Sequence, residues 1–466
     1  MKRITFTIVL AMSTSLVWCQ QFGLYNSLTL YDAFENPSQK AFQADSSRKY
    51  AFNFFVPTFS FNGRFSGPAE NNFKTLIYQR AINGRDLALG QGVMNMVTAQ
   101  TNSYMLMLRI FSRVEYNREI GFSWQIRNEG RANVTNESLA IFDNFGLFGQ
   151  DEYSNIFNNE GFNQSYNQYS FNYREDFNKR LSLGVKLSLL SGITYNELNI
   201  EESQLSIRRD LNEFDVQLKG NFKSNVLESD LNSGIINPTF RDPGVSVSLG
   251  GSYKFRGGWF LLGNLKDIGF IKWNKNSYNY DLDNLIKIDN AQFPSADERL
   301  RDGIESMIKQ RRANAQFNSM INGKAEALVN KNFGNYKPNF ILSKNLFYPG
   351  GNAALVNNYH WRNVVLTGTG SYNLDKYVQI GGQFMIKSPN VEFFLGTDNL
   401  LKTYHSSRSL ITDFPYGGGA SSASAYMGFA MKFGRMMEHQ PNSNFIPGMN
   451  ANHDRVGIFR RLFGKR

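Results

Sequence analysis

The sequence predicts an all-β protein, a transmembrane antiparallel β-barrel of about 14 strands with an N-terminal lumenal segment and one loop helix. Three observations predict this fold. Polar and apolar residues alternate along segments of about 10 to 14 residues, which are longer than most soluble strands. The chain begins with an export signal, and no run of about 18 apolar residues follows it. Connections look short at one end of the predicted strands and long at the other, as is usual in such barrels.

Residues 243–273 show the alternation most clearly. Successive side chains of a strand point to opposite faces, so this stretch has one apolar face and one polar face. We expect the apolar set to face lipid and the polar set to face the lumen; the two sets are Val245, Val247 and Leu249, and Ser246, Ser248 and Lys254. Gly257 and Gly258 supply the positive φ of a tight hairpin, which we expect on the periplasmic side.

The composition favours one large closed sheet. The 466 residues include 40 Phe and 22 Tyr, too many aromatics for a disordered chain, and no linker or charge run divides them. The net charge is +11, but Lys and Arg are scattered singly along alternating strands. This distribution argues against a nucleic-acid partner and suits a barrel lumen or a surface that faces anionic lipid.

Residues 1–19 have the features of a signal peptide. A basic start precedes a short apolar core over residues 4–16, and small residues precede a cleavage site before Gln20. The alternative is a lipoprotein acylated at Cys19, although Trp18 stands where such signals have a small residue. Cleavage after Cys19 leaves no cysteine, so we expect neither a disulfide framework nor a thiolate metal site.

The exported chain divides into three predicted parts, of which the first two are a plug and a barrel. Residues 20–48 have a weak pattern broken by Asn36 and Pro37, and we expect them to lie in the lumen. Residues 49–433 form the predicted barrel. Its first strand contains Pro57, which should interrupt the pairing because proline cannot donate to the ladder.

Three segments within the barrel region have distinct patterns. Residues 130–162 are rich in Asn, Gly and Asp and indicate a long polar loop, whereas residues 214–222 alternate like a wall strand. Residues 294–312 are the best helix in the chain, because Ser295 and Glu298 form a capping box ahead of an apolar face. We expect this helix to pack on the barrel mouth, and the alternative is a plug or a partner-docking element.

The third part is a basic tail over residues 434–466. It carries six basic residues and two acids, a net charge of +4. One interpretation is a disordered periplasmic tail. The other is a peptide that docks on a partner or on the membrane through Arg455, Arg460 and Arg461.

No motif of an enzyme occurs in the sequence. The four His residues are scattered without metal-ligand spacing, and the chain has no nucleophile elbow, phosphate-binding loop or dinucleotide fingerprint. The triple glycine at residues 417–419 lies in a polar loop without a following helix. We therefore predict that the protein is not an enzyme and binds no cofactor or metal.

Four short motifs resemble a family of exported barrels of unknown function from the Bacteroidota. They are Asn36-Pro37, residues 267–273 (DIGFIKW), residues 397–401 (TDNLL) and residues 425–435 (AYMGFAMKFGR). That family is similar in plan to the FadL-type fatty-acid transporters and to the barrel subunit of type IX secretion. The resemblance implies an outer-membrane barrel with Asn36-Pro37 in the lumen near a hatch. It transfers no ligand-binding residue, and Ser38 departs from the alanine that is commoner there.

Three functions are consistent with these features. The first is an outer-membrane barrel that binds or passes a small hydrophobic compound, as the FadL resemblance implies, with membrane lipid as its surroundings. The second is a structural or assembly subunit that docks protein partners through its loops and tail. The third is a soluble β-rich surface protein, since a soluble sandwich shows the same bare alternation.

Overall fold

The computed structural model of the protein describes residues 21–42, 48–79, 82–111, 117–225, 238–289, 299–300, 302–304, 306, 314–412, 421–436 and Phe459. Most of these residues lie in one antiparallel sheet of 19 strands.

The strands are β1 (Arg48–Phe52), β2 (Thr58–Ser66), β3 (Met94–Phe111), β4 (Arg118–Thr135), β5 (Glu152–Ser154), β6 (Glu160–Asp176), β7 (Leu181–Arg208), β8 (Glu213–Ser224), β9 (Pro243–Lys254), β10 (Trp259–Trp273), β11 (Tyr278–Ile288), β12 (Phe317–Met320), β13 (Lys324–Lys331), β14 (Tyr336–Asn345), β15 (Gly351–Trp361), β16 (Val364–Asn373), β17 (Tyr377–Lys387), β18 (Val391–Thr397) and β19 (Ser421–Met436). The α-helices are α2 (Leu30–Glu35), α3 (Glu70–Gln79), α4 (Asn136–Ala140) and α6 (Leu400–Thr412), and the 3-10 turns are η1 (Phe22–Leu24), η2 (Gly84–Asp86), η3 (Phe145–Leu147) and η6 (Arg256–Gly258).

The sheet closes into a barrel of 14 strands, as the sequence predicts. Closure joins β19 to both β1 and β2, with Phe52 opposite Met431 and Phe59 opposite Met427. The strand elements outnumber the wall positions for two reasons. β1 and β2 share one position, as do β12 and β13, while β5, β8 and β11 lie outside the wall.

The first wall strand is broken at residues 53–57, where the sequence predicts an interruption at Pro57. The side chain of Asn53 replaces the missing ladder contacts. Its Nδ2 donates to the carbonyl of Met105 at 3.2 Å, and its Oδ1 accepts from the backbone N–H of Met107 at 3.0 Å. The break therefore leaves β3 bonded to the first wall strand through a side chain.

The two faces of the wall follow the predicted alternation in β9. Val245 and Leu249 are 48% and 52% exposed on the outer face, whereas Ser246 and Ser248 are 6% and 1% exposed on the inner face. Lys254 lies at the exposed end of the strand. The following η6 turn has Gly257 at φ 77° and Gly258 at φ 82°, the left-handed conformation that the sequence predicts for this hairpin.

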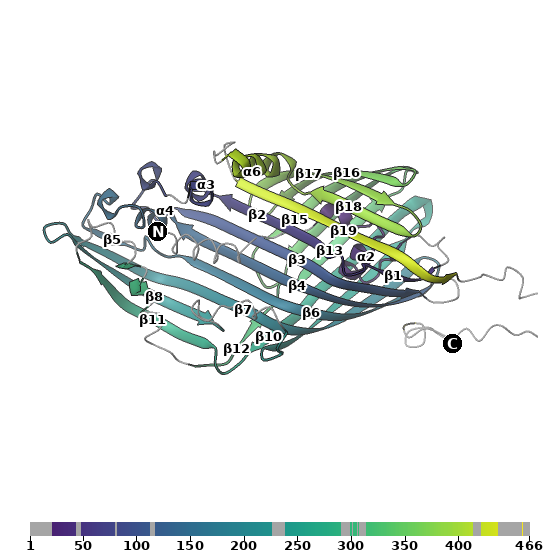
Figure 1. Ribbon diagram of the computed structural model, residues 1–466, viewed down its shortest axis with the longest axis horizontal. Coiled ribbons are helices and arrows are strands. Elements are labelled where there is room, and N and C mark those ends of the chain that lie inside the picture. The colour runs from purple at the N-terminus through teal and green to yellow at the C-terminus, as the bar shows by residue number, and fades with distance from the viewer. Residues whose placement is uncertain are drawn as a thin grey trace, which may run out of the picture.

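The two ends of the barrel differ in their connections. At the end that holds the start of β1 and the end of β19, the strands are joined by short turns such as η6. At the other end, long connections carry α3, α4 and α6 (Figure 1). The exposed aromatic residues Trp259, Phe333, Tyr336 and Trp361 line the short-turn end.

An extension projects beyond the barrel at the long-connection end. It consists of β5, β8, β11 and the outer part of β7, residues 196–208, which pairs with β8 while β8 pairs with β11 (Figure 1). The sequence assigns residues 214–222 to the barrel wall, and that assignment is wrong because β7 continues for 28 residues. The first part of β7, residues 181–191, pairs with β9 in the wall. β8 therefore has no position in the wall.

Helices occur in several of the long connections, where the sequence predicts only one. α3 and α4 pack into the extension side, and α6 follows β18 directly. The predicted helix over residues 294–312 falls largely outside the described residues. Within the described part of the chain, no helix has the length and apolar character needed to cross a membrane.

Candidate functional site

A β-bulge in β10 places two adjacent charges on the inner face of the barrel. Leu265 pairs with Leu249 and Ile268 with Val247, so Lys266 and Asp267 together oppose only Ser248. Asp267 has φ 49°, and the bulge reverses the alternation at this point. Lys266 and Asp267 are 5% and 1% exposed and both point into the lumen.

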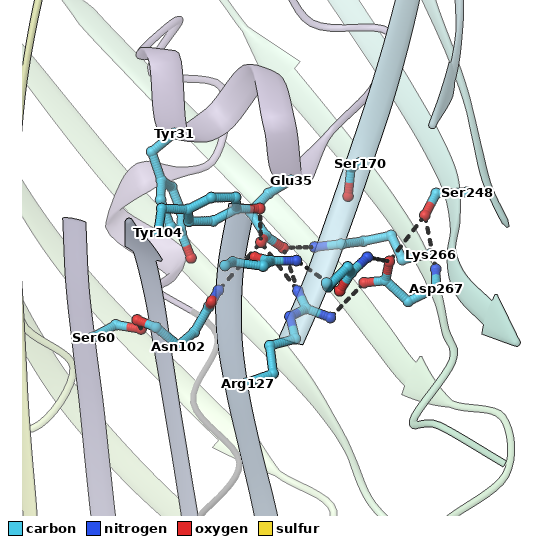
Figure 2. A network of polar contacts seen from close by, with 12 residues as sticks. Tyr31, Glu35, Ser60, Asn102, Tyr104, Arg127, Ser170, Ser248, Lys266 and Asp267 are labelled. Atoms are coloured by element: carbon cyan, nitrogen blue, oxygen red, sulfur yellow. Dashed lines mark hydrogen bonds and ion pairs between the residues drawn. The ribbon is translucent and has the colours of Figure 1, made fainter. Parts of the chain in front are cut away.

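Arg127 of β4 lies at the centre of the ion pairs around this bulge (Figure 2). Its Nη1 is 2.5 Å from Oδ2 of Asp267, and its Nη2 is 3.1 Å from Oε1 of Glu35 in α2. Lys186 of β7 reaches Oδ1 of Asp267 at 3.0 Å. Asp267 therefore pairs with two cations, and Arg127 joins the wall to the N-terminal segment.

Lys266 extends the network to β13, the strand that pairs with β10. Nζ of Lys266 lies 2.7 Å from Oε2 of Glu35 and 3.6 Å from Oε2 of Glu326 in β13. The hydroxyl of Tyr104 donates to Glu35 at 2.7 Å, and the hydroxyl of Tyr25 donates to Glu326 at 2.6 Å. We call Glu35, Arg127, Lys186, Lys266, Asp267 and Glu326 the lumen cluster. Its three cations and three acids balance.

A second group of ion pairs holds the chain after α2. Arg109 of β3 lies 3.0 Å from Glu119 of β4, and both side chains are buried. Nε of Arg174 in β6 donates to the carbonyl of Ser38 at 3.0 Å, and Glu119 accepts from the backbone N–H of Ala41 at 3.2 Å. Charged side chains of the wall thus bond the backbone of the N-terminal segment.

Asn36 and Pro37 fit against the wall where β7 and β9 carry glycine. A Cβ added at Gly184 would lie 2.1 Å from the carbonyl oxygen of Pro37, and one added at Gly250 would lie 3.4 Å from its Cδ. Asn264 of β10 donates to Oδ1 of Asn36 at 2.5 Å. The two glycines allow the turn after α2 to approach the inner wall closely.

The first turn of the N-terminal segment covers an apolar part of the inner wall. Phe22 and Tyr25 pack against buried apolar residues of β10, β13, β14 and β15, which are Leu262, Leu328, Ile341, Ala354 and Val356. We call these five residues the inner apolar patch. It contrasts with the polar inner wall elsewhere, such as Ser246, Ser248 and Asn264.

The two acids of α2 have opposite electrostatic surroundings. Burial raises the pKa of Asp32 to about 6, although hydrogen bonds from Asn36 and from the backbone of Leu28 oppose the shift. Burial also acts to raise the pKa of Glu35, but Lys266 and Arg127 outweigh it and hold that pKa far below its usual value. Glu35 is thus an ion-pair partner, whereas the raised pKa of Asp32 means that it would change its protonation state near pH 6.

The N-terminal segment and the wall both line one small cavity. A polar cavity of about 30 Å³ is lined by Tyr31, Glu35, Arg127, Lys266 and Asn322. This volume suits a water molecule rather than a solute. Within the residues that the structure describes, no three His, Cys, Asp or Glu side chains are grouped to hold a metal ion.

The predicted site residues fall in three places. Ser248 lies in the network, because its hydroxyl accepts from the backbone N–H of Asp267 at 2.8 Å. Asn36 is 1% exposed, and Pro37 is also buried against the inner wall. Ser246 lines the same wall at another position of β9. Arg455, Arg460 and Arg461 lie outside the described residues.

The charged residues of the lumen cluster are not among the site residues that the sequence predicts. The signal for one of them is the DIGFIKW motif, which begins at the bulge residue Asp267. In regular alternation, Lys266 and Asp267 would face opposite sides, so only the bulge brings them together. No pattern in the sequence pairs Arg127 with Glu35.

Comparisons with known proteins place the chain in a family. The chain resembles the solved structures of the toluene transporter TodX of P. putida (8% identity, 87% of this chain, 94% of that chain, TM-score 0.43), the toluene transporter TbuX of Ralstonia pickettii (8%, 86%, 94%, 0.38) and a Pseudomonas aeruginosa FadL homologue (10%, 89%, 96%, 0.41). The comparison with curated proteins found no match. Residues 41–398 match a family of unknown function, and the chain therefore belongs to the family DUF5723.

Proposed function

We propose that the protein is an outer-membrane barrel that binds or passes a small hydrophobic compound, with residues 21–42 as its plug in the closed state. The observation that carries this proposal is the inner apolar patch. The lumen of a water-filled barrel is polar, but here five apolar side chains line the inner wall under Phe22 and Tyr25. A hydrophobic compound would take over these contacts when the two aromatic rings move away.

The contacts of the plug are consistent with reversible docking. Charged and polar side chains hold residues 21–42 at several points, including Glu35 with Arg127 and Lys266, and Ser38 with Arg174. Such contacts require defined geometry, and water can replace each of them when the segment leaves.

Photolabelling with a small aliphatic diazirine tests the cargo class. On β14 and β15, Ile341 and Val356 face the lumen, while their neighbours Leu342 and Leu355 are 48% and 49% exposed on the outer face. The Phe22→Ala protein should be labelled more strongly at the inner pair than the wild type. The outer pair should label equally in both proteins and serves as the internal control. Labelling confined to the outer pair in both proteins would contradict a hydrophobic lumen site.

Heat-modifiable migration on gels tests the membrane location. Val247→Lys places a charge on the proposed lipid face and should hinder barrel assembly by about 2–4 kcal/mol if the site is near the midplane. Leu211→Lys is the matched control, because Leu211 is 55% exposed at the turn between β7 and β8, far from the proposed membrane. Normal assembly of the Val247→Lys protein would show that this face does not contact lipid.

A second candidate is a subunit that docks a protein partner, and the extension favours it. β7, β8 and β11 carry the sheet well beyond the wall. Leu211 in the turn between β7 and β8 is 55% exposed, and Leu285 of β11 is 53% exposed. Affinity purification of the wild type and of a Leu211→Asp, Leu285→Asp double variant tests this idea. An unchanged set of partners would exclude docking through these residues.

A further inference from the structure

We propose that α6 is an interfacial helix that binds the anionic surface of the membrane at the long-connection end of the barrel. This inference rests on the membrane location proposed above. It assigns to the loop between β18 and β19 an interaction surface and a partner, a lipid surface with negatively charged headgroups.

α6 completes the wall where β18 stops early. The pairing of β18 with β19 ends at Gly396 opposite Tyr426, so β19 continues without a β18 partner. The hydroxyl of Thr403 accepts from the backbone N–H of Ser424 at 3.0 Å, and the hydroxyl of Ser406 donates to the carbonyl of Ser422 at 3.0 Å. The polar face of α6 thus bonds the edge of β19.

The start of α6 lies against the outer face of the barrel. A Cβ added at Gly382 of β17 would lie 3.0 Å from Cδ1 of Leu400, and Gly382 alternates with the inner residues Gly381 and Gln383. Figure 1 shows α6 at the upper margin of the wall, beside the start of β19. The helix is therefore placed beside the wall and not across the lumen.

The outer side of α6 is an apolar stripe that is interrupted at Ser407 and Arg408, which are also exposed. The stripe contains four exposed apolar residues, separated by one, three and seven positions along the chain. They are Leu400 (47% exposed), Leu401 (65%), Tyr404 (59%) and Ile411 (84%). This spacing puts them on one side of a helix. The stripe continues the apolar outer face of the neighbouring strands, where Leu395 and Ile380 are 51% and 58% exposed. A lipid phase that covers the strands would reach the stripe without a break.

The charge of α6 selects an anionic surface. The helix carries Lys402 and Arg408 and no Asp or Glu. Arg408 lies four residues after Tyr404, on the exposed side. A basic amphipathic helix with an apolar face is typical of segments that lie in a membrane interface, where long cationic side chains reach the headgroups. A charged and apolar stripe of this kind favours lipid over an uncharged protein partner.

Site-directed spin labelling in nanodiscs tests this inference. Single cysteines replace Ile411 in the stripe, Leu395 on the outer face of β18 and Leu211 in the extension, in a Cys19→Ser chain. The discs contain phosphatidylcholine alone or with phosphatidylglycerol. We expect the labels at 411 and 395 to be more accessible to oxygen than to a nickel chelate, and the label at 211 to show the reverse. Phosphatidylglycerol should shift the label at 411 further toward oxygen, and Lys402→Gln with Arg408→Gln should abolish that shift.

Other results would overturn the inference in distinguishable ways. If the nickel chelate reaches the label at 411 while oxygen is favoured at 395, the protein is a membrane barrel whose α6 does not contact lipid. Nickel access at both positions would refute the membrane location as well. A label at 411 that neither reagent reaches would show that a protein, such as a second copy, covers the stripe. A shift with phosphatidylglycerol that survives the double charge variant would refute the role of Lys402 and Arg408.

Discussion

The lumen cluster and the core of the extension are built from opposite kinds of contact. In the lumen, buried ion pairs such as Arg127 with Asp267 and Glu35 with Lys266 join the plug to the wall. In the extension, apolar side chains from β7, β8 and β11 pack together, among them Leu205, Phe214 and Ile286. Apolar packing tolerates small shifts, whereas ion pairs hold only in a defined geometry. We therefore propose that the extension is a permanent support and that residues 21–42 can separate from the wall.

The largest expected effect comes from the core of the extension. Phe214 is 1% exposed, so Phe214→Ala should cost about 3–5 kcal/mol through lost burial and a cavity. Hydrogen exchange should accelerate in β8 and β11 and stay unchanged in residues 22–42. Leu211→Ala, at an exposed site, is the control and should stay within about 0.5 kcal/mol. Faster exchange in residues 22–42 would show that the two regions are coupled.

Breaking the lumen cluster should have a comparable but differently located effect. Arg127→Met leaves Asp267 without its closest cation and removes one cation from Glu35, at a cost of about 3–5 kcal/mol. Exchange should accelerate in residues 22–42 and not in β8. Lys219→Met, which breaks an exposed pair with Glu202, is the control and should leave exchange in residues 22–42 unchanged.

A charge-matched variant sharpens the Arg127 test. Arg127→Met leaves the lumen cluster with two cations and three acids, and adding Asp267→Asn restores the balance of charge, so part of the protection of residues 22–42 should return. No recovery would indicate that Arg127 acts through packing alone.

A smaller effect is expected at the seat of the Asn36-Pro37 turn. Gly184→Ala places a Cβ 2.1 Å from the carbonyl oxygen of Pro37, and relieving this clash should cost about 1–3 kcal/mol. Limited proteolysis should then cut residues 21–42 more readily. Gly368→Ala is the matched control, since no heavy atom lies within 4 Å of its added Cβ. Equal cleavage of both variants would contradict the seating of the turn against β7.

The smallest expected effect is a dependence of plug docking on pH. The pKa of Asp32 is raised to about 6, so the docked segment favours the protonated acid. Its contribution to docking is complete below about pH 4 and is lost as the pH rises through about 6. Protection of residues 22–42 should therefore be greater at about pH 5 than at about pH 8. Asp32→Asn should remove this difference, although Lys387 and Glu392 also face the site. A pH profile unchanged by Asp32→Asn would assign the titration to those neighbours.

Much of the wall follows from local pattern. Alternation assigns Val245 and Leu249 to the outer face and Ser246 and Ser248 to the inner face, and their exposures agree. Pro57 marks the break in the first strand, and Gly257 and Gly258 mark a hairpin. These features depend on residues a few positions apart, for which strand geometry and positive φ are sufficient.

Residues that contact across the barrel could not be paired in this way. Glu35 and Arg127 are far apart in the chain and meet only after the wall closes. The sequence also does not predict that β7 continues beyond the wall to pair with β8. Residues 214–222 of β8 alternate in the same way whether they pair in the wall or in the extension. α6 was missed because its polar face matches the backbone edge of β19, which no local pattern reveals.

In the stretch from β9 to β10, local sequence explains one feature and tertiary contacts explain another. Its side-chain order alone requires a two-faced hairpin with a glycine turn, because a strand has a period of two and a tight turn needs positive φ. The bulge at Asp267 is a tertiary outcome. There Lys266 and Asp267 leave regular alternation, because Glu35, Arg127 and Lys186 compensate two charges on one buried face.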